Sequence, residues 1–322
     1  MYYPHNIEEL CYEPDHIEKV INEITIKFNN YFKEFIETES GNIVVDDNII
    51  KLAKSLKAKL TITKKHVNYS LRFNQIIKDS LEDFKKDRKN YLDILDEEFL
   101  EEYLDDPGPF KNKVLRNDCP IIRKTLNSSA KELNKYKKDF GISDPSELLD
   151  KVINIAIFGH EYKRSIFNSN FYNIKNVKDL KFNHLLTEEY IVYGVIGGGI
   201  KSHFLYKMYP QIFPNRSHNA LWALWYLTSK KKFDCKEDSE FLMINIKEST
   251  TQQNFFYPYD LFTFYAIHIL QLLKSKAKEE KLKIPQNYSF VIVDEFLNFI
   301  TSCHSDEILP LKKQIKNYSY DY

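Results

Sequence analysis

The stretch YIVYGVIGGGIKSH, residues 190–203, decides how the second half of the chain is interpreted. Its first seven residues are rich in β-branched and aromatic side chains, which is typical of a strand. Four of the eight glycines in the chain lie between 194 and 199, and a helical pattern begins near Lys201. The stretch therefore predicts a strand, a glycine-rich turn and a helix in direct succession.

Two further segments, EFLMINI (240–246) and SFVIVDE (289–295), resemble this strand in composition, and helical stretches separate the three. This alternation predicts a mixed or parallel sheet covered by helices. From 15 to about 105, apolar residues recur every three or four positions, which indicates helices. The predicted fold class is therefore α+β or mixed α/β, with a helical, basic part at 1–140 and a small mixed sheet covered by helices at 141–322.

Two breaks divide the helical pattern. DDPGPF (105–110) places a glycine between two prolines. GISDPSE (141–147) predicts the start of a helix, with Ser143 or Asp144 as its N-cap and Pro145 in its first turn.

Composition limits the class of protein. The chain has 322 residues, enough for two domains with cores of their own. Its four cysteines include no CxxC pair, which excludes a zinc ribbon or knuckle and gives no sign of a disulfide framework. The first residues lack an apolar signal segment, and the most apolar run (261–273) is too short and too polar for a bilayer. We therefore expect a cytoplasmic protein without membrane contact.

The net charge of zero conceals strong segregation. Residues 51–90 carry twelve Lys and Arg against four acids, residues 91–106 carry eight acids and no base, and residues 111–138 carry nine Lys and Arg against two acids. Basic blocks favour a polyanion such as a nucleic acid as partner. The alternative is a set of solvated helix faces held together by alternating charge.

The glycine-rich turn allows two interpretations. A strand, such a turn and a helix resemble in part the phosphate loop of ATPases, and SFVIVDE resembles their magnesium-binding strand. In that motif glycine directly precedes lysine, whereas here Ile200 separates Gly199 from Lys201. A tight turn that brings a strand close to a helix is the favoured interpretation, and P-loop-like nucleotide binding is an alternative.

LTITKKHVNYSL (60–71) resembles the turn and second helix of a helix-turn-helix unit, within a basic region at 48–73. Thr63 stands at the N-cap of the recognition helix, and Val67 follows it by four residues. The resemblance implies duplex DNA as the partner. It assigns the contacts with bases and phosphates to Lys64, Lys65, His66, Asn68, Tyr69 and Arg72. Thr61 replaces the usual glycine of the turn, so a continuous basic helical hairpin is the alternative.

KKFDCKEDSEFLMINIKESTTQQNFFYPYDLF (231–262) resembles the core of PD-(D/E)xK nucleases, inside a possible nuclease-like region at 190–300. The resemblance implies Mg²⁺-dependent hydrolysis of DNA by a restriction-like endonuclease of prokaryotic antiviral defence. It assigns the metal ligand to Asp234 and the remaining catalytic positions to Asn245, Lys247, Gln253 and Tyr257. Asn245 stands where the family has an acid, and an amide brings no charge to a hard cation.

A third set, Lys201, His203, Arg216 and His218, is expected to guide a nucleic-acid backbone. The alternative for these residues is ordinary surface charge and helix capping, with Asn215 or Ser217 of PNRSHN (214–219) as the N-cap of the following helix. The sequence thus predicts a nucleic-acid-binding protein, with Mg²⁺-dependent nuclease activity as the enzyme hypothesis. The alternative is a non-catalytic interaction protein that acts as a homodimer or with a partner protein.

Overall fold

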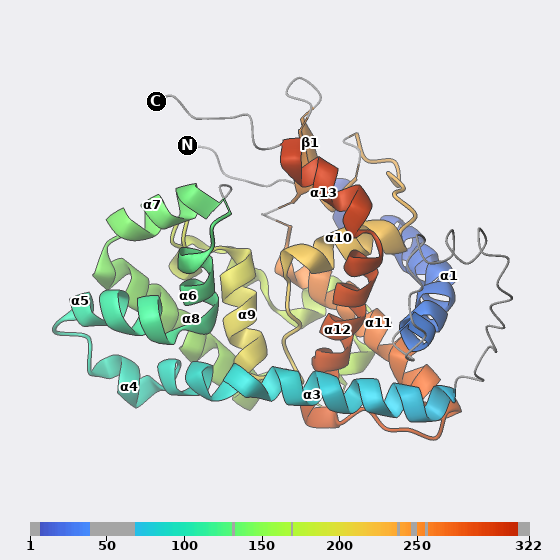
Figure 1. Cartoon of the computed structure of the whole chain (residues 1–322), viewed down its shortest axis with the longest axis horizontal. Coiled ribbons are helices and arrows are strands. Elements are labelled where there is room, and N and C mark those ends of the chain that lie inside the picture. The colour runs from blue at the N-terminus through green and yellow to red at the C-terminus, as the bar shows by residue number, and fades with distance from the viewer. Residues whose placement is uncertain are drawn as a thin grey trace, which may run out of the picture.

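A computed structural model of the chain describes residues 7–38, 68–130, 133–168, 170–236, 239–245, 250–254 and 257–314. For 183, 243–245, 250–253 and 312–314 it describes the backbone alone. The described residues form an all-α fold (Figure 1). Its one β element is a short antiparallel hairpin of β1 (Leu242–Asn245) and β2 (Thr250–Gln253). The predicted sheet covered by helices is therefore wrong.

Two of the three predicted strands belong to other structures. SFVIVDE begins the helix α12 (Ser289–Cys303), whose apolar residues are buried on all sides. A short continuous apolar run suits a buried helix as well as a buried strand, so periodicity alone does not separate the two. YIVYGVI contributes an isolated bridge between Val192 and Ile196 around a turn at Gly194, which has a φ of +78°. A Cβ there would lie 2.2 Å from Oδ2 of Asp139, so the turn requires glycine.

The helix predicted after the glycine-rich turn is present as α9 (Gly198–Met208). Gly197 is its N-cap, and Gly198 lies so close to the guanidinium of Arg216 that a Cβ would meet Nη1 at 2.5 Å. The turn thus brings a helix start against a large side chain.

The central core surrounds α12. This helix packs against α1 (Pro14–Thr38), α3 (Tyr69–Ile94), α10 (His218–Leu227) and α11 (Tyr259–Glu279). Phe296 of α12 contacts the rings of Phe28 and Phe35 on α1, so the aromatic residues of the two chain ends meet. Burying several such rings supplies much of the hydrophobic stabilisation.

A second group of helices lies beside this core, and α3 runs along one side of the molecule and contacts both groups (Figure 1). The second group comprises α4 (Glu97–Glu101), α5 (Pro107–Pro109), η2 (Phe110–Asp118), α6 (Pro120–Asn127), α7 (Asn134–Ile142), α8 (Pro145–Ser165) and α9. Asp144 caps α8 by accepting hydrogen bonds from the backbone of Ser146 and Glu147, which confirms one of the two predicted caps.

Short elements complete the described chain. They are η1 (Glu9–Tyr12), η4 (Phe171–Asn173), η5 (Val177–Leu180), η6 (Asn183–Leu186), η7 (Glu188–Tyr190), η8 (Gln286–Tyr288) and α13 (Ser305–Gln314). One continuous set of buried apolar residues extends from Cys11 to Ile308 and includes both predicted halves of the chain. Among the described residues, no helix has the length and apolar character needed to cross a membrane.

Candidate metal centre and basic surface

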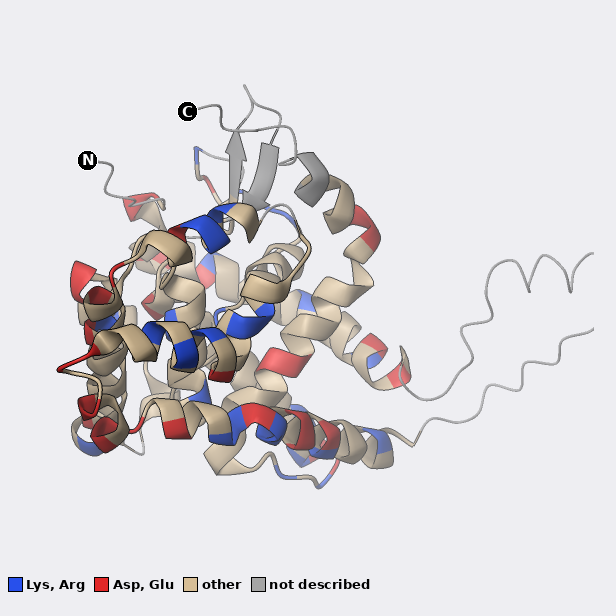
Figure 2. Ribbon diagram, turned by 60° about the vertical axis from the view of Figure 1, so that its left-hand side comes forward, with Lys and Arg blue, Asp and Glu red and all other residues tan. Residues whose placement is uncertain are grey.

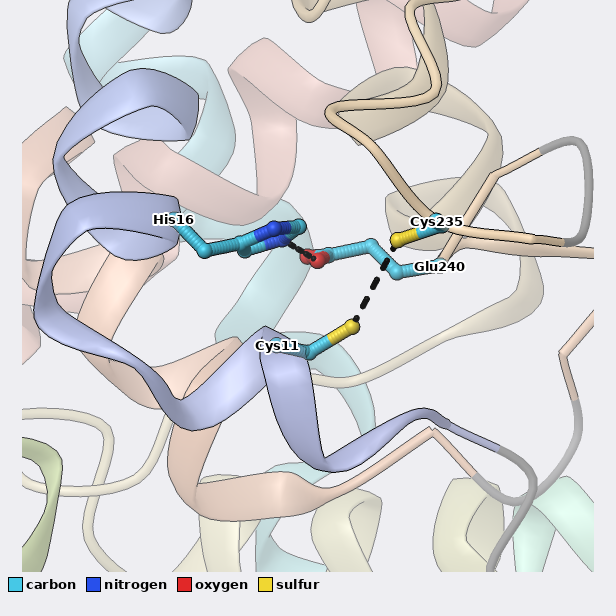
Figure 3. A group of neighbouring side chains, drawn as sticks. All are labelled: Cys11, His16, Cys235 and Glu240. Carbon is cyan, nitrogen blue, oxygen red and sulfur yellow. Dashed lines mark hydrogen bonds and ion pairs between the residues drawn. The ribbon is translucent and has the colours of Figure 1, made fainter.

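Four potential metal ligands meet between the start of the chain and the loop that precedes the hairpin (Figure 3). Cys11 lies in η1 and His16 in the first turn of α1, whereas Cys235 and Glu240 lie between α10 and β1. One donor atom from each side chain lies within 4.8 Å of the others, and all four residues are buried. We call this set the metal cluster. Its sequence signature is C-x4-H followed far downstream by C-x4-E.

The contacts inside the metal cluster form two pairs. The Sγ atoms of Cys11 and Cys235 are 3.8 Å apart, and both cysteines are free thiols. Nε2 of His16 lies 2.5 Å from Oε2 of Glu240. In Figure 3 the imidazole and the carboxylate point toward each other from opposite sides, with the two sulfurs beside them. Soft sulfur donors and harder nitrogen and oxygen donors thus converge on one buried site.

A second layer of hydrogen bonds orients two of these donors. Nδ1 of His16 is 3.2 Å from the backbone oxygen of Phe233. A carbonyl oxygen only accepts hydrogen bonds, so Nδ1 donates its proton to Phe233, and a second proton lies between Nε2 and Glu240. The hydroxyl of Tyr257 donates to Oε1 of Glu240 at 2.8 Å, which leaves Oε2 directed at the cluster.

The loop that carries Cys235 has an unusual backbone. Phe233 and Asp234 have φ values of 50° and 70°, in the left-handed region that side-chain-bearing residues seldom adopt. Two contacts beside the cluster tie this loop to the first residues of the chain. Lys19 forms an ion pair with Asp234 at 2.6 Å, and Glu8 accepts a hydrogen bond from the backbone of Lys236 at 2.6 Å. The loop is therefore held in its strained conformation by the N-terminal segment.

The electrostatics of the metal cluster distinguish its two thiols. The hydrogen bond between them, together with burial, raises the pKa of Cys11, and the same bond lowers the pKa of Cys235. Burial alone would lower the pKa of His16, but the hydrogen bond and the charge of Glu240 outweigh it and raise that pKa. The hydrogen bond between the two sulfurs therefore favours ionisation of one thiol of this pair.

A second feature is a basic surface formed by η2, α6 and α7, in which α6 contacts both neighbours. We define it by Lys113, Arg116, Arg123, Lys124, Lys135, Lys137 and Lys138. Six of these side chains are exposed and Lys137 is half-buried. The same three helices carry two acids, Asp118 and Asp139. Figure 2 marks the Lys and Arg positions on the ribbon.

The other basic block differs from this surface. Its described part is mostly α3, where Lys78, Lys86 and Lys89 alternate with acids along the helix. Lys86 is paired with Asp83 at 2.5 Å, and Asp87 is paired with Lys207 of α9 at 2.6 Å. On α3 the alternating charges are those of a solvated helix face.

The residues predicted from the helix-turn-helix resemblance are only partly described. Lys64, Lys65 and His66 lie outside the described residues. Asn68 is the N-cap of α3 and accepts from the backbone of Leu71, and the Tyr69 hydroxyl donates to Glu37 at 2.5 Å. Arg72 is half-buried on α3.

The residues predicted from the nuclease resemblance are only partly described. Asp234 is exposed and paired with Lys19. Asn245 ends β1 opposite Thr250, and Gln253 ends β2 opposite Leu242, with their side chains not described. Lys247 lies outside the described residues. Tyr257 lies at the metal cluster, as the buried hydrogen-bond donor to Glu240.

The four members of the third predicted set differ in exposure: two are buried, His203 is half-buried and His218 is exposed. Lys201 and Arg216 are buried, and their side chains donate to the backbone oxygens of Leu185 and Asn254. Burial, followed by the charge of Arg216, lowers the pKa of Lys201 to about 7. His203 bonds Asn215 and Tyr91.

His218, the fourth member of this set, begins α10, where the preceding Ser217 is the N-cap. The cap predicted from PNRSHN is thus present at Ser217, one of its two expected positions.

Sequence reasoning missed the metal cluster because its halves are more than two hundred residues apart. The paired C-x4-H and C-x4-E spacings are the signal that points to it. Comparison of the chain with protein families, with curated proteins and with solved structures finds no match.

Proposed function

We propose that this chain binds a nucleic acid, through phosphate contacts on the basic surface of η2, α6 and α7. The observation that carries the proposal is the concentration of seven solvent-accessible basic residues against two acids on three adjoining helices of a chain with zero net charge. A local excess of cations attracts a polyanion even where the whole protein is neutral.

Two arginines give this surface a fixed part. The guanidinium of Arg116 lies over the ring of Phe140, with Cζ 5.3 Å from the ring centre. Nη1 of Arg123 donates to the backbone oxygen of Asn117 at 2.9 Å. Arginines oriented in this way suit the planar recognition of phosphate, and the exposed lysines around them add charge without requiring a particular sequence. The surface therefore supports binding to the backbone rather than the reading of bases.

The proposal covers binding and no hydrolysis. Asp234, the expected magnesium ligand, is engaged by Lys19, and the two described thiols nearby are poor ligands for magnesium. An acidic protein is the competing partner for the same charges, and the measurement below separates the two.

Binding should be measured by fluorescence anisotropy with labelled duplex DNA and single-stranded RNA while salt rises from about 50 to about 200 mM. The test variant carries Lys113→Gln, Lys124→Gln and Lys138→Gln. The matched control carries Lys78→Gln, Lys86→Gln and Lys89→Gln on α3, all exposed, with the same change in net charge.

We expect the test variant to bind more weakly and to show a slope of log K against log salt that is smaller by about two to three, since each lost phosphate contact removes about 0.9. The control should bind almost as the wild type does. Equal losses in both variants, or no binding to either nucleic acid at low salt, would contradict the proposal.

A further inference from the structure

We propose that Cys11, His16, Cys235 and Glu240 bind one zinc ion through two thiolates, one imidazole and one carboxylate. Four side chains of the types that bind zinc direct one donor atom each to within 4.8 Å of one another, from two segments distant in the sequence (Figure 3). They are joined by no disulfide.

The separation of the sulfurs fits a tetrahedral site. A Zn–S bond of about 2.3 Å places two sulfur ligands of a tetrahedron about 3.8 Å apart. The Sγ atoms of Cys11 and Cys235 are 3.8 Å apart. A disulfide would need them at about 2.0 Å, so the backbone holds these cysteines at the spacing of ligands.

The nitrogen and oxygen ligands require a small adjustment. Nε2 of His16 and Oε2 of Glu240 are 2.5 Å apart, a hydrogen-bond distance. Bound to one ion at about 2.1 Å each, they would stand about 3.4 Å apart. Zinc therefore replaces the hydrogen bond between these two side chains, which requires the two donor atoms to move apart by about 1 Å.

The second layer matches that of known zinc ligands. A zinc-bound histidine almost always donates its other N–H to a carboxylate, a carbonyl or water, which fixes the ring and its tautomer. Nδ1 of His16 has this bond to the Phe233 backbone oxygen at 3.2 Å. A ligating carboxylate is commonly hydrogen-bonded in turn, and the Tyr257 hydroxyl bonds Glu240 at 2.8 Å.

The donor set and its burial select the ion and its role. Two thiolates disfavour magnesium and calcium, which prefer oxygen ligands, and the mixed S, N and O set suits zinc. Cys11, His16, Cys235 and Glu240 are 0%, 2%, 7% and 5% exposed. Four protein ligands without solvent access leave no position for a substrate, so the site is structural rather than catalytic.

The ion would link two segments of the fold that are far apart in the sequence. Its ligands Cys11 and Cys235 are 224 residues apart, so one ion closes most of the chain into a loop. It also secures the loop at Phe233 and Asp234, whose left-handed backbone needs external support. Binding displaces the thiol protons to solvent, and zinc affinity should therefore fall as the pH falls.

The test uses the full chain, purified with a thiol reductant and without chelators. Metal content should be measured by inductively coupled plasma mass spectrometry. The apo protein should then be titrated with Co²⁺ alone. We expect one zinc per chain, and a cobalt spectrum with intense tetrahedral d–d bands and a thiolate-to-cobalt charge-transfer band. Cys11→Ser and Cys235→Ser should each lose a large part of the charge-transfer intensity, whereas Cys303→Ser, which removes an exposed thiol outside the cluster, should retain it in full.

If a cysteine variant fails to fold, the decisive test is a change at Tyr257, which positions Glu240. Tyr257→Phe keeps the ring and removes only the hydroxyl that bonds Glu240. We expect it to fold and to lose zinc affinity by about 10–100-fold in competition with a chelating dye. The proposal is overturned if the wild-type protein contains no zinc or gives no tetrahedral cobalt spectrum. It is also overturned if Cys235→Ser and Cys303→Ser give equal spectra, or if Tyr257→Phe binds zinc with unchanged affinity.

Discussion

His16 and His203 show how the same side chain acquires opposite properties in two regions of one core. His16 lies beside a carboxylate and two thiols, and Glu240 raises its pKa in spite of burial. His203 lies between the Tyr91 hydroxyl at 3.1 Å and the Asn215 amide oxygen at 3.3 Å. Burial, followed by the charge of Lys207, lowers the pKa of His203 to about 4.

The difference lies in what converges on the ring. Around His203 the hydrogen bonds continue from Asn215 to Asp294 at 3.0 Å, and each polar group is satisfied by another. Around His16 the neighbouring groups are acids that can become anionic ligands together. The first region is a hydrogen-bond network that stabilises the packing of α3, α9 and α12, and the second is a candidate binding site.

Removing each histidine gives the largest expected contrast. His16→Ala leaves Glu240 buried without its partner, which should cost about 3–5 kcal/mol in free energy of unfolding. His203→Ala leaves neutral groups unsatisfied and should cost about 1–3 kcal/mol. Urea unfolding measures both values.

A chelator sharpens this contrast. Prior removal of metal should destabilise the wild type and His203→Ala alike, and it should change His16→Ala little, because that variant has lost a ligand. If the chelator leaves the stability of the wild type unchanged, both histidines serve only the packing of the fold and neither binds a metal.

The pH dependence of stability should expose the network around His203. The folded pKa of His203 is about 4, below the ordinary value near 6.5, so the unfolded chain binds more protons between these values. Stability from this group is therefore present above about pH 6.5 and is lost as pH falls toward 4. His203→Gln should remove that loss in urea unfolding measured across the window.

Asp294 should act in the opposite direction over nearly the same range. Burial, partly offset by the hydrogen bond from Asn215, raises its pKa to about 7. The folded state then binds more protons, so the stability from this group is full below about pH 4 and is lost as pH rises through 7. Asp294→Asn should be more stable than the wild type at pH 8 and should show a steeper loss toward acid. If stability has the same pH profile in Asp294→Asn and in the wild type, Asp294 is not part of the hydrogen-bond network.

The sequence predicted local structure better than tertiary packing. The apolar spacing of 15–38 and the cap at Asp144 were interpreted correctly because caps and periodicity are local. The residue types of SFVIVDE suit a buried strand and a buried helix equally, and its assignment to a strand is wrong. Only contact with α1, α10 and α11 decides between them, and a sequence does not contain that information directly.

The candidate sites show a related limit. Lack of a CxxC pair excluded a ribbon, yet it says nothing about a site assembled from two distant single cysteines. Lys201 and Arg216 are residue types that suit a phosphate site, but both side chains are buried and donate hydrogen bonds to backbone oxygens. The charge block at 111–138 follows directly from composition, and most of its described Lys and Arg side chains are exposed on short helices.

The smallest expected effect belongs to Asp234, which stands next to the metal cluster without belonging to it. Its carboxylate is exposed and points to Lys19 at 2.6 Å, and Lys19 lowers its pKa through their hydrogen bond. An exposed ion pair contributes little to stability, and zinc would be bound by the neighbouring Cys235 instead. Asp234→Asn should therefore leave zinc content, the cobalt spectrum and the unfolding midpoint at pH 7 unchanged. Its double-mutant cycle with Lys19→Gln should show weak coupling that disappears in high salt. A loss of bound metal in Asp234→Asn would instead make Asp234 a ligand, and would move the centre from the buried side of this loop to its exposed side.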